Sequence, residues 1–181
     1  MAVVETVDTY ENPMKRLRVA KVVINISVGK SGEPLQRAMR VLEDITGHKS
    51  CQRKAKQSIR NFGISRKEPI SCIVTLRGLD AITFLKRALE AVNNQISHSS
   101  FDRQGNFAFG IREHIDIPGT TYVPELGIVG MDICVSFEKP GYRVKRRRIK
   151  RSNISRRHII TPEEGRYFVK NSLGVELVGA E

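Results

Sequence analysis

Apolar and polar residues alternate between Lys21 and Val28, which is the two-residue period of a strand buried mainly on one face. The pattern breaks at Gly29 to Gly32, and Pro34 then suits the first turn of a helix. The apolar positions that follow recur every three or four residues, and Gly47 can end the helix. These positions are Leu35, Ala38, Met39, Leu42 and Ile45. A strand followed by an amphipathic helix is therefore predicted.

The same unit recurs further along the chain. Ile70 to Leu76 reads as a strand, and a helix is predicted to start at an Asp80 cap. Its apolar stripe is Ile82, Leu85, Leu89, Val92 and Ile96. Two more alternating stretches, Phe107 to Ile111 and Met131 to Phe137, predict two further strands.

Two segments lie outside this periodic pattern. Asp116 to Gly130 is rich in proline and glycine, and loops of this length are often functional. Near the C-terminus, Thr161 and Glu164 have capping-box spacing around Pro162, which predicts the start of a short last helix.

The order of elements predicts an α+β (α/β two-layer) fold, with a mixed sheet and helices packed on one face. We expect one domain over residues 1–181. It has an N-terminal tail (1–12), a core (13–138) that carries a basic loop (49–67), and a basic extension with a short terminal helix (139–181). There is no internal repeat and no linker rich in proline and serine.

Charge changes the picture, because the formal net charge is +12 and the pI is near 10.0. Such an excess favours a polyanionic partner, through counterion release from phosphates. A membrane is disfavoured because no apolar run approaches the roughly 18 residues that span a bilayer. Met1 to Asn12 lacks the features of a signal peptide, so a cytoplasmic protein is expected.

The positive charge is concentrated in two segments that together hold seventeen of the 31 Lys and Arg residues. The basic loop (49–67) carries seven basic residues and no acidic one, with donors suited to phosphate and a Phe62 suited to stacking. The alternative interpretation is a solvated polar loop, which Ile59, Phe62 and Ile64 anchor to the core.

The second cluster, called here the basic segment (139–157), carries ten basic residues. Because the charges repel one another when unpaired, we expect this segment to be extended or disordered until RNA binds. A nuclear import signal would have the same composition.

Enzyme motifs fit poorly. Gly29-Lys30-Ser31 resembles the end of a phosphate-binding loop, but the required earlier glycine is replaced by Ile24. The four histidines and three cysteines show no metal-ligand spacing. Glu113, His114 and Asp116 are close in sequence. Neighbouring residues of a strand point to opposite faces, so we expect no catalytic pair here. We expect no catalysis, no cofactor and no metal.

A second RNA-binding fold, the RNA recognition motif, is an alternative because residues 105–110 partly resemble its aromatic strand. Asn106 interrupts that motif, and Phe107 and Phe109 share a face with Ile111. A core role for both phenylalanines is favoured.

Several segments together resemble the large-subunit ribosomal protein five family, in its archaeal and eukaryotic branch. In order, they are Asn12 to Met14, Lys21 to Gly29 (KVVINISVG), Arg53 to Lys67 (RKAKQSIRNFGISRK), Val74 to Gly78 (VTLRG), Asn106 to Ile117 (NFAFGIREHIDI) and Gly127 to Ile133 (GIVGMDI). The resemblance implies a curved, mostly antiparallel sheet and a place in the central protuberance of the large subunit. It also implies binding of 5S rRNA and large-subunit rRNA.

The resemblance and the charge together give the candidate site residues. The resemblance assigns RNA contact to Asn25, Ser27, Gly29, Lys30, Arg77, Arg103 and Asn106. Charge alone assigns rRNA contact to Arg143, Lys145, Arg146, Arg147, Arg148, Lys150 and Arg151. The resemblance further implies that a loop reaches toward P-site tRNA, here with Arg53, Lys54, Lys56, Ser58, Arg60, Asn61, Phe62, Arg66 and Lys67.

The expected partners are 5S rRNA, large-subunit rRNA, P-site tRNA and neighbouring ribosomal proteins. A small-subunit protein at an intersubunit bridge is a further candidate. The alternative function is a free RNA-binding regulator of the RNA-recognition-motif type.

Overall fold

The computed structural model describes residues 12–179, built around a five-stranded sheet in which every neighbouring pair is antiparallel. The strand order is β2-β3-β1-β6-β5. Their bounds are β1 Arg18–Ser27, β2 Cys51–Lys54, β3 Pro69–Leu76, β5 Phe107–Ile111 and β6 Met131–Glu138. The predicted fold class is confirmed, and β2 is a strand that the sequence pattern did not predict.

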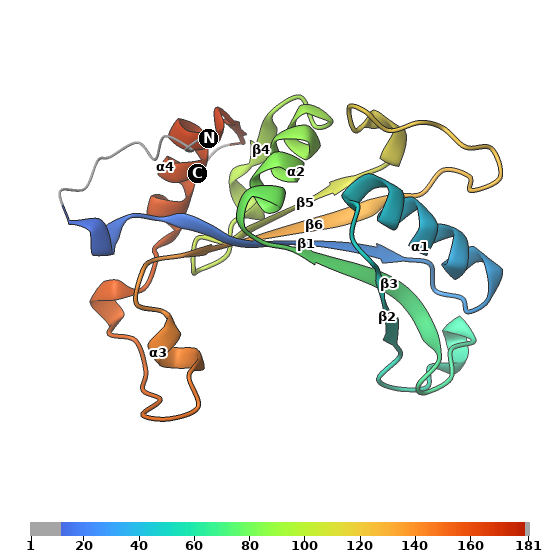
Figure 1. Ribbon diagram of the computed structural model, residues 1–181, viewed down its shortest axis with the longest axis horizontal. Coiled ribbons are helices and arrows are strands. Elements are labelled where there is room, and N and C mark those ends of the chain that lie inside the picture. The colour runs from blue at the N-terminus through green and yellow to red at the C-terminus, as the bar shows by residue number, and fades with distance from the viewer. Residues whose placement is uncertain (1–11, 180–181) are drawn as a thin grey trace.

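Two helices, α1 (Glu33–Thr46) and α2 (Gly78–Glu90), cover one face of the sheet (Figure 1). The core lies between them and the inward side chains of the strands, and Ile24 and Ile133 of the sheet and Leu85 of α2 are fully buried. Phe107 and Ile111 also point into this layer, with Phe109 packed against it. The predicted core role of the two phenylalanines is confirmed.

The start and end of α1 follow the sequence signals. Pro34 lies in its first turn, and Gly47 ends the helix with φ 67°, a left-handed conformation that glycine adopts without steric cost. The buried residues of α1 include Leu35, Ala38 and Leu42, as the apolar stripe predicts.

The predicted bounds of α2 were wrong at both ends. Arg77 is the N-cap, and Asp80 lies in the first turn instead. The helix ends at Glu90 because Asn93 and Asn94 adopt positive φ values of 54° and 55°. Ile96, predicted as its last apolar contact, is buried in a separate strand, β4 (Gln95–Ser97).

The C-terminal part packs beside the sheet. The terminal helix α4 (Pro162–Leu173) has the predicted capping box: Glu164 N donates to Thr161 Oγ1 (3.3 Å), and Thr161 N donates to Glu164 Oε2 (3.1 Å). Phe168 meets the ring of Phe137 edge-on, with centroids 5.2 Å apart. The chain then forms β7 (Glu176–Val178), which pairs in parallel with β4.

The remaining elements are short. In the described part of the chain they are one four-residue α-helix, α3 (Arg143–Arg146), and five 3-10 turns: η1 Pro13–Lys15, η2 Arg60–Phe62, η3 His98–Ser100, η4 His114–Asp116 and η5 Arg156–His158. In the part of the chain from 12 to 179, no helix combines the length and apolarity needed to cross a membrane. The stretch read as lacking a signal peptide lies almost wholly outside the described residues.

Candidate nucleic-acid interface

The sheet has a second face that no helix within residues 12–179 covers, called here the open face. Figure 1 shows α1 and α2 on one side of the sheet, while the basic loop and the basic segment project on the other. Strand alternation sets the composition of the open face, because each strand sends every second side chain to it. Its side chains are Lys21, Val23, Asn25 and Ser27 of β1, Cys51 and Arg53 of β2, Ser71, Ile73 and Thr75 of β3, Ala108 and Gly110 of β5, and Asp132, Cys134 and Ser136 of β6.

Most of these side chains are small or polar, which leaves the strand backbones accessible to a large partner. Cys134 lies between Val23 and Ala108 in the strand register, and Asp132 lies between Asn25 and Gly110. Asn25 Nδ2 donates to Ser27 Oγ over 3.1 Å, so these two predicted RNA-binding residues lie together at one end of β1. The open face is thus a polar surface with few long side chains.

The basic loop is a folded projection from the β2–β3 edge. Ile59 and Ile64 form an isolated antiparallel bridge, and Gly63 closes the tip in the left-handed conformation. Phe62, at this tip, is 73% exposed, so it does not anchor the loop to the core. Ser58 Oγ accepts a hydrogen bond from Arg66 N (2.8 Å), which gives that predicted binding residue a role within the loop.

The turn after β1 lies against the same loop. Gly29 N donates to Ile70 O (3.0 Å), and the Ser31 hydroxyl donates to Glu68 Oε1 (2.6 Å). Lys30 in this turn is exposed. The hydroxyl of Ser31, followed by the backbone N–H of Ser65, lowers the pKa of Glu68 below its usual value. The turn and the basic loop therefore form one cationic end of the open face.

The basic segment has a more definite structure than the sequence suggested. It contains α3, and the Tyr142 hydroxyl donates to His158 O (3.2 Å) and accepts from Ile160 N (3.2 Å). Burial raises the pKa of this tyrosine. The expectation of an extended or disordered chain was wrong because these contacts close the segment into a loop.

Two ion pairs between described residues join the basic segment to the fold. The Lys139 ammonium, 4% exposed, contacts both carboxylate oxygens of Glu164 at 2.9 and 2.7 Å. Arg146 pairs with Glu138, whose side chain is 8% exposed at the end of β6. The other basic side chains between 143 and 157 point to solvent and face no acidic partner within residues 12–179.

Comparison with known proteins agrees with this geometry. Residues 12–65 match the family described as Ribosomal protein L5, and residues 69–163 match the model of that family's C-terminus. The large ribosomal subunit protein uL5 of Aeropyrum pernix is 51% identical over 176 residues, which cover 96% of this chain and 92% of that protein. The chain belongs to the ribosomal protein L5 family. The proteins of the same name from Pyrobaculum aerophilum (49% identical; 92% and 93% covered) and Methanococcus vannielii (47%; 93% and 94%) agree.

Membership of the L5 family makes the chain a ribosomal protein of the large subunit, involved in translation and not an enzyme. It also removes the RNA-recognition-motif interpretation. That motif stacks bases on aromatic side chains of an uncovered sheet face, whereas Phe107 and Phe109 here face the helices.

Four of the predicted RNA-binding residues of this L5-family chain meet in one place. Arg77, Asn106, Lys145 and Arg146 line a hollow of about 360 Å³ on the open-face side, called here the cationic hollow. The Asn106 side chain also has a role within the fold, because its Oδ1 accepts from Phe137 N (3.0 Å) and its Nδ2 donates to Asp102 Oδ2 (2.9 Å). Arg103 is exposed on the neighbouring turn and does not line the hollow.

The sequence reasoning missed other residues of the cationic hollow: Lys21, Gln104, Ser136 and Tyr142. A signal for Lys21 was present, because it has the same strand parity as Asn25 and Ser27. Gln104, Ser136 and Tyr142 come from three separate segments that only the fold brings together.

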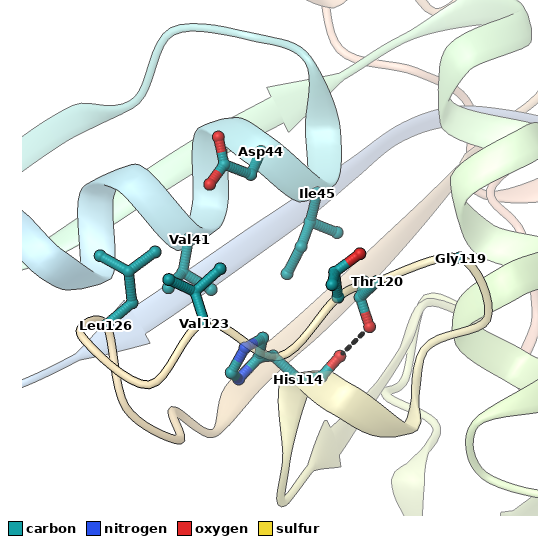
Figure 2. Close-up of a pocket in the computed structure, with 9 residues that line it drawn as sticks. Val41, Asp44, Ile45, His114, Gly119, Thr120, Val123 and Leu126 are labelled. Carbon is teal, nitrogen blue, oxygen red and sulfur yellow. Dashed lines mark hydrogen bonds between the residues drawn. The ribbon is translucent and has the colours of Figure 1, made fainter.

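The loop of residues 114–126, on the helix side of the sheet, is held together by His114. A hollow of about 250 Å³ lies between α1 and residues 114–126, with His114 and Asp44 in its wall (Figure 2). His114 is buried, and its Nδ1 accepts from Val129 N over 3.3 Å, while the Thr120 hydroxyl donates to His114 O over 3.0 Å. The histidine therefore organises this loop. Within 12–179 no group of histidine, cysteine or carboxylate side chains has the arrangement of a metal site.

Proposed function

We propose that this L5-family protein binds 5S rRNA and large-subunit rRNA through its open face, in the central protuberance of the large subunit. The observation that carries the proposal is the two-sided sheet. One face is buried under helices, and the other is polar and flanked by two cationic projections (Figure 1).

The physical argument combines shape and charge. Small side chains such as Ala108, Gly110 and Cys134 allow an RNA helix to approach the strands, while the basic loop and the basic segment contact phosphates on either side. Because the two projections hold seventeen basic residues, RNA association is accompanied by the release of many counterions.

A filter-binding titration tests the proposal. The purified protein is expected to select 5S rRNA over an unrelated duplex of equal length at near-cellular ionic strength. Log affinity is expected to fall steeply with log salt, by roughly 0.7 to 0.9 for each phosphate neutralised. Equal affinity for both RNAs, or a flat salt response, contradicts the proposal.

We propose a second contact, between the basic loop and P-site tRNA. It is supported by the tip of the loop, where Arg60, Asn61 and Phe62 are exposed, and Phe62 is available for stacking. Arg53 and Lys54 instead lie in β2, opposite Ser71 and Pro69, at the root of the projection.

This difference gives a matched pair of variants. Arg60→Ala with Phe62→Ala is expected to weaken tRNA retention on the ribosome more than it weakens 5S rRNA binding. Arg53→Ala with Lys54→Ala is expected to weaken 5S rRNA binding more strongly. If both pairs affect both assays equally, the loop has no separate tRNA role.

For cellular location we propose the cytoplasmic ribosome, where neighbouring ribosomal proteins, and a small-subunit protein at an intersubunit bridge, are the protein partners. Family membership supports this proposal. The helix layer lies on the opposite side of the sheet from the proposed RNA-binding surface, so it is available for contact with proteins. After sucrose-gradient fractionation, the protein should peak with the large subunit. A pool mainly outside that peak would favour a free regulator.

A further inference from the structure

The cationic hollow contains more positive charge than the fold itself uses. Lys21 of β1, Arg77 after β3 and Lys145 of α3 line it, and none of them has an ion pair within residues 12–179. Among the described residues that form its wall, the only carboxylate is Glu138, which Arg146 already neutralises. Within residues 12–179, the lining therefore carries three uncompensated cations.

These cations come from separate parts of the chain and are held close together by the sheet. Lys21 of β1 pairs with Ser136 of β6. The next residue of β1, Val22, pairs with Leu76 of β3, and Arg77 directly follows Leu76. Like charges held at such positions repel one another, and an anion among them removes that repulsion. Arg77 offers a planar group of donors suited to phosphate oxygens, and Ser136 and Gln104 add neutral polar side chains to the lining.

The far wall of the hollow depends on one ion pair. Glu138 is almost fully buried at the end of β6, and Arg146 reaches it from α3. A buried carboxylate is stable only when it is paired, so this contact fixes the position of α3 and of Lys145 over the hollow. Glu138 thereby acts as a positioning residue in a site for anions, although its own charge is negative.

We infer that the cationic hollow seats one backbone phosphate of the bound RNA, held by Lys21, Arg77 and Lys145, with the Glu138–Arg146 pair fixing its wall. This inference rests on the proposed function and adds a specific locus to it. The hollow is a discrete place on the open-face side where the RNA register is fixed, in contrast to the diffuse attraction of the two projections.

The first test scans 5S rRNA with single neutral methylphosphonate linkages. At one linkage the substitution is expected to weaken wild-type binding roughly tenfold, as for the loss of one charged hydrogen-bonded contact. The same RNA is expected to bind Arg77→Gln no more weakly than unmodified RNA does. Arg40→Gln removes the same charge from an exposed position of α1, and this variant is expected to keep the wild-type interference pattern.

The second test uses Glu138→Gln, which raises the net charge by one. If only total charge mattered, this variant would bind RNA more tightly. A positioning role predicts weaker binding and a weaker effect of the critical methylphosphonate. An unchanged melting temperature in the variant shows that the fold is retained, and Arg146→Gln provides a second disruption of the pair from its exposed side.

The outcomes separate cleanly. If wild-type protein fails to select 5S rRNA, the proposed function fails and the inference fails with it. If it selects 5S rRNA but Arg77→Gln behaves like Arg40→Gln, only the phosphate locus is overturned. If adenosine 5′-monophosphate binds wild type but not Arg77→Gln, while RNA binding is equal in both, the hollow serves a free nucleotide and the RNA inference is overturned.

Discussion

The Ser31 hydroxyl donates a 2.6 Å hydrogen bond to Glu68 Oε1, and this contact joins the turn after β1 to the basic loop. The second carboxylate oxygen of Glu68 accepts from Ser65 N over 2.9 Å. One carboxylate therefore holds two segments that we propose to contact RNA. It also explains why an acidic residue directly follows a long acid-free stretch.

We predict that the turn after β1 and the basic loop separate only when the pH falls below 4.5, the ordinary pKa of a glutamate. The pKa of Glu68 is lowered below the ordinary value of 4.5, so its contribution to stability is complete above that value. The contribution is lost as the pH falls through the lower pKa of the folded state. Carbon-detected NMR titration of the Glu68 carboxyl, read together with the Ser65 amide, checks this, and a midpoint at or above 4.5 contradicts it.

Glu68→Gln should separate the two segments at neutral pH, because the amide carries no negative charge and its NH2 group cannot accept one of the two hydrogen bonds that the carboxylate accepts from Ser31 and Ser65. Faster trypsin cleavage after Arg66 and Lys67 is the expected result. Glu125→Gln, on the helix side, removes an equal charge from an exposed position and should leave the cleavage rate unchanged.

Cysteine alkylation gives a prediction that needs no mutation. Cys134 is exposed on the open face and Cys72 is fully buried, with burial raising the pKa of the Cys72 thiol to about 11. Iodoacetamide at pH 8 should modify Cys134 and spare Cys72 until the protein unfolds. Adding 5S rRNA should slow the reaction at Cys134 in proportion to the bound fraction.

The same experiment contains its own control. Modification of Cys72 would report unfolding during the assay, so protection at Cys134 can be separated from a change in stability. A Cys134 rate that stays constant at saturating 5S rRNA would place the RNA elsewhere on the protein.

Much of this fold follows from local periodicity. The alternation of β1, the stripe of α1 and the capping box at Thr161 each predicted an element that the structure contains. Ile96 was misassigned because its spacing continues the stripe of α2, while two asparagines with positive φ break the helix before it. Periodicity carries no signal for that break.

The candidate site was less predictable. Phe62 could not be assigned to tip or core from the sequence, because both uses suit an aromatic residue in a polar loop. Asn106 was assigned to RNA contact, and no local pattern indicates that its amide also holds the 102–106 turn and β6. The assembly of Lys21, Arg77 and Lys145 depends on strand order, which local patterns do not give.

Helix α2 offers a matched pair of core and surface substitutions. Leu85 is fully buried and Leu79 is 70% exposed. Leu85→Ala should lower the free energy of unfolding by about 2 to 5 kcal/mol, from lost burial and the cavity left behind. Leu79→Ala should change it by no more than about 0.5 kcal/mol. Urea unfolding measures both, and equal losses would show that α2 does not pack as described.

Two glycines test how the C-terminal helix is joined to the sheet. A Cβ on Gly165 of α4 would lie 2.8 Å from Gly105 Cα, so the helix or the 102–106 turn must move. Gly165→Ala should lower the free energy of unfolding by about 1 to 3 kcal/mol, as overpacking does. Because that turn carries Gln104 and Asn106, both in the wall of the cationic hollow, RNA affinity should fall as well.

Gly110→Ala is the control for this substitution. The nearest atom to its Cβ would be Asp132 Oδ1, at 3.7 Å on the open face, so the fold has room for it. Alanine in a strand is more stable than glycine by about 0.5 to 1 kcal/mol, so the free energy of unfolding should rise slightly. Thermal melts of both variants, with a 5S rRNA titration of Gly165→Ala, check these predictions. If Gly165→Ala melts like wild type, α4 does not pack closely on the 102–106 turn.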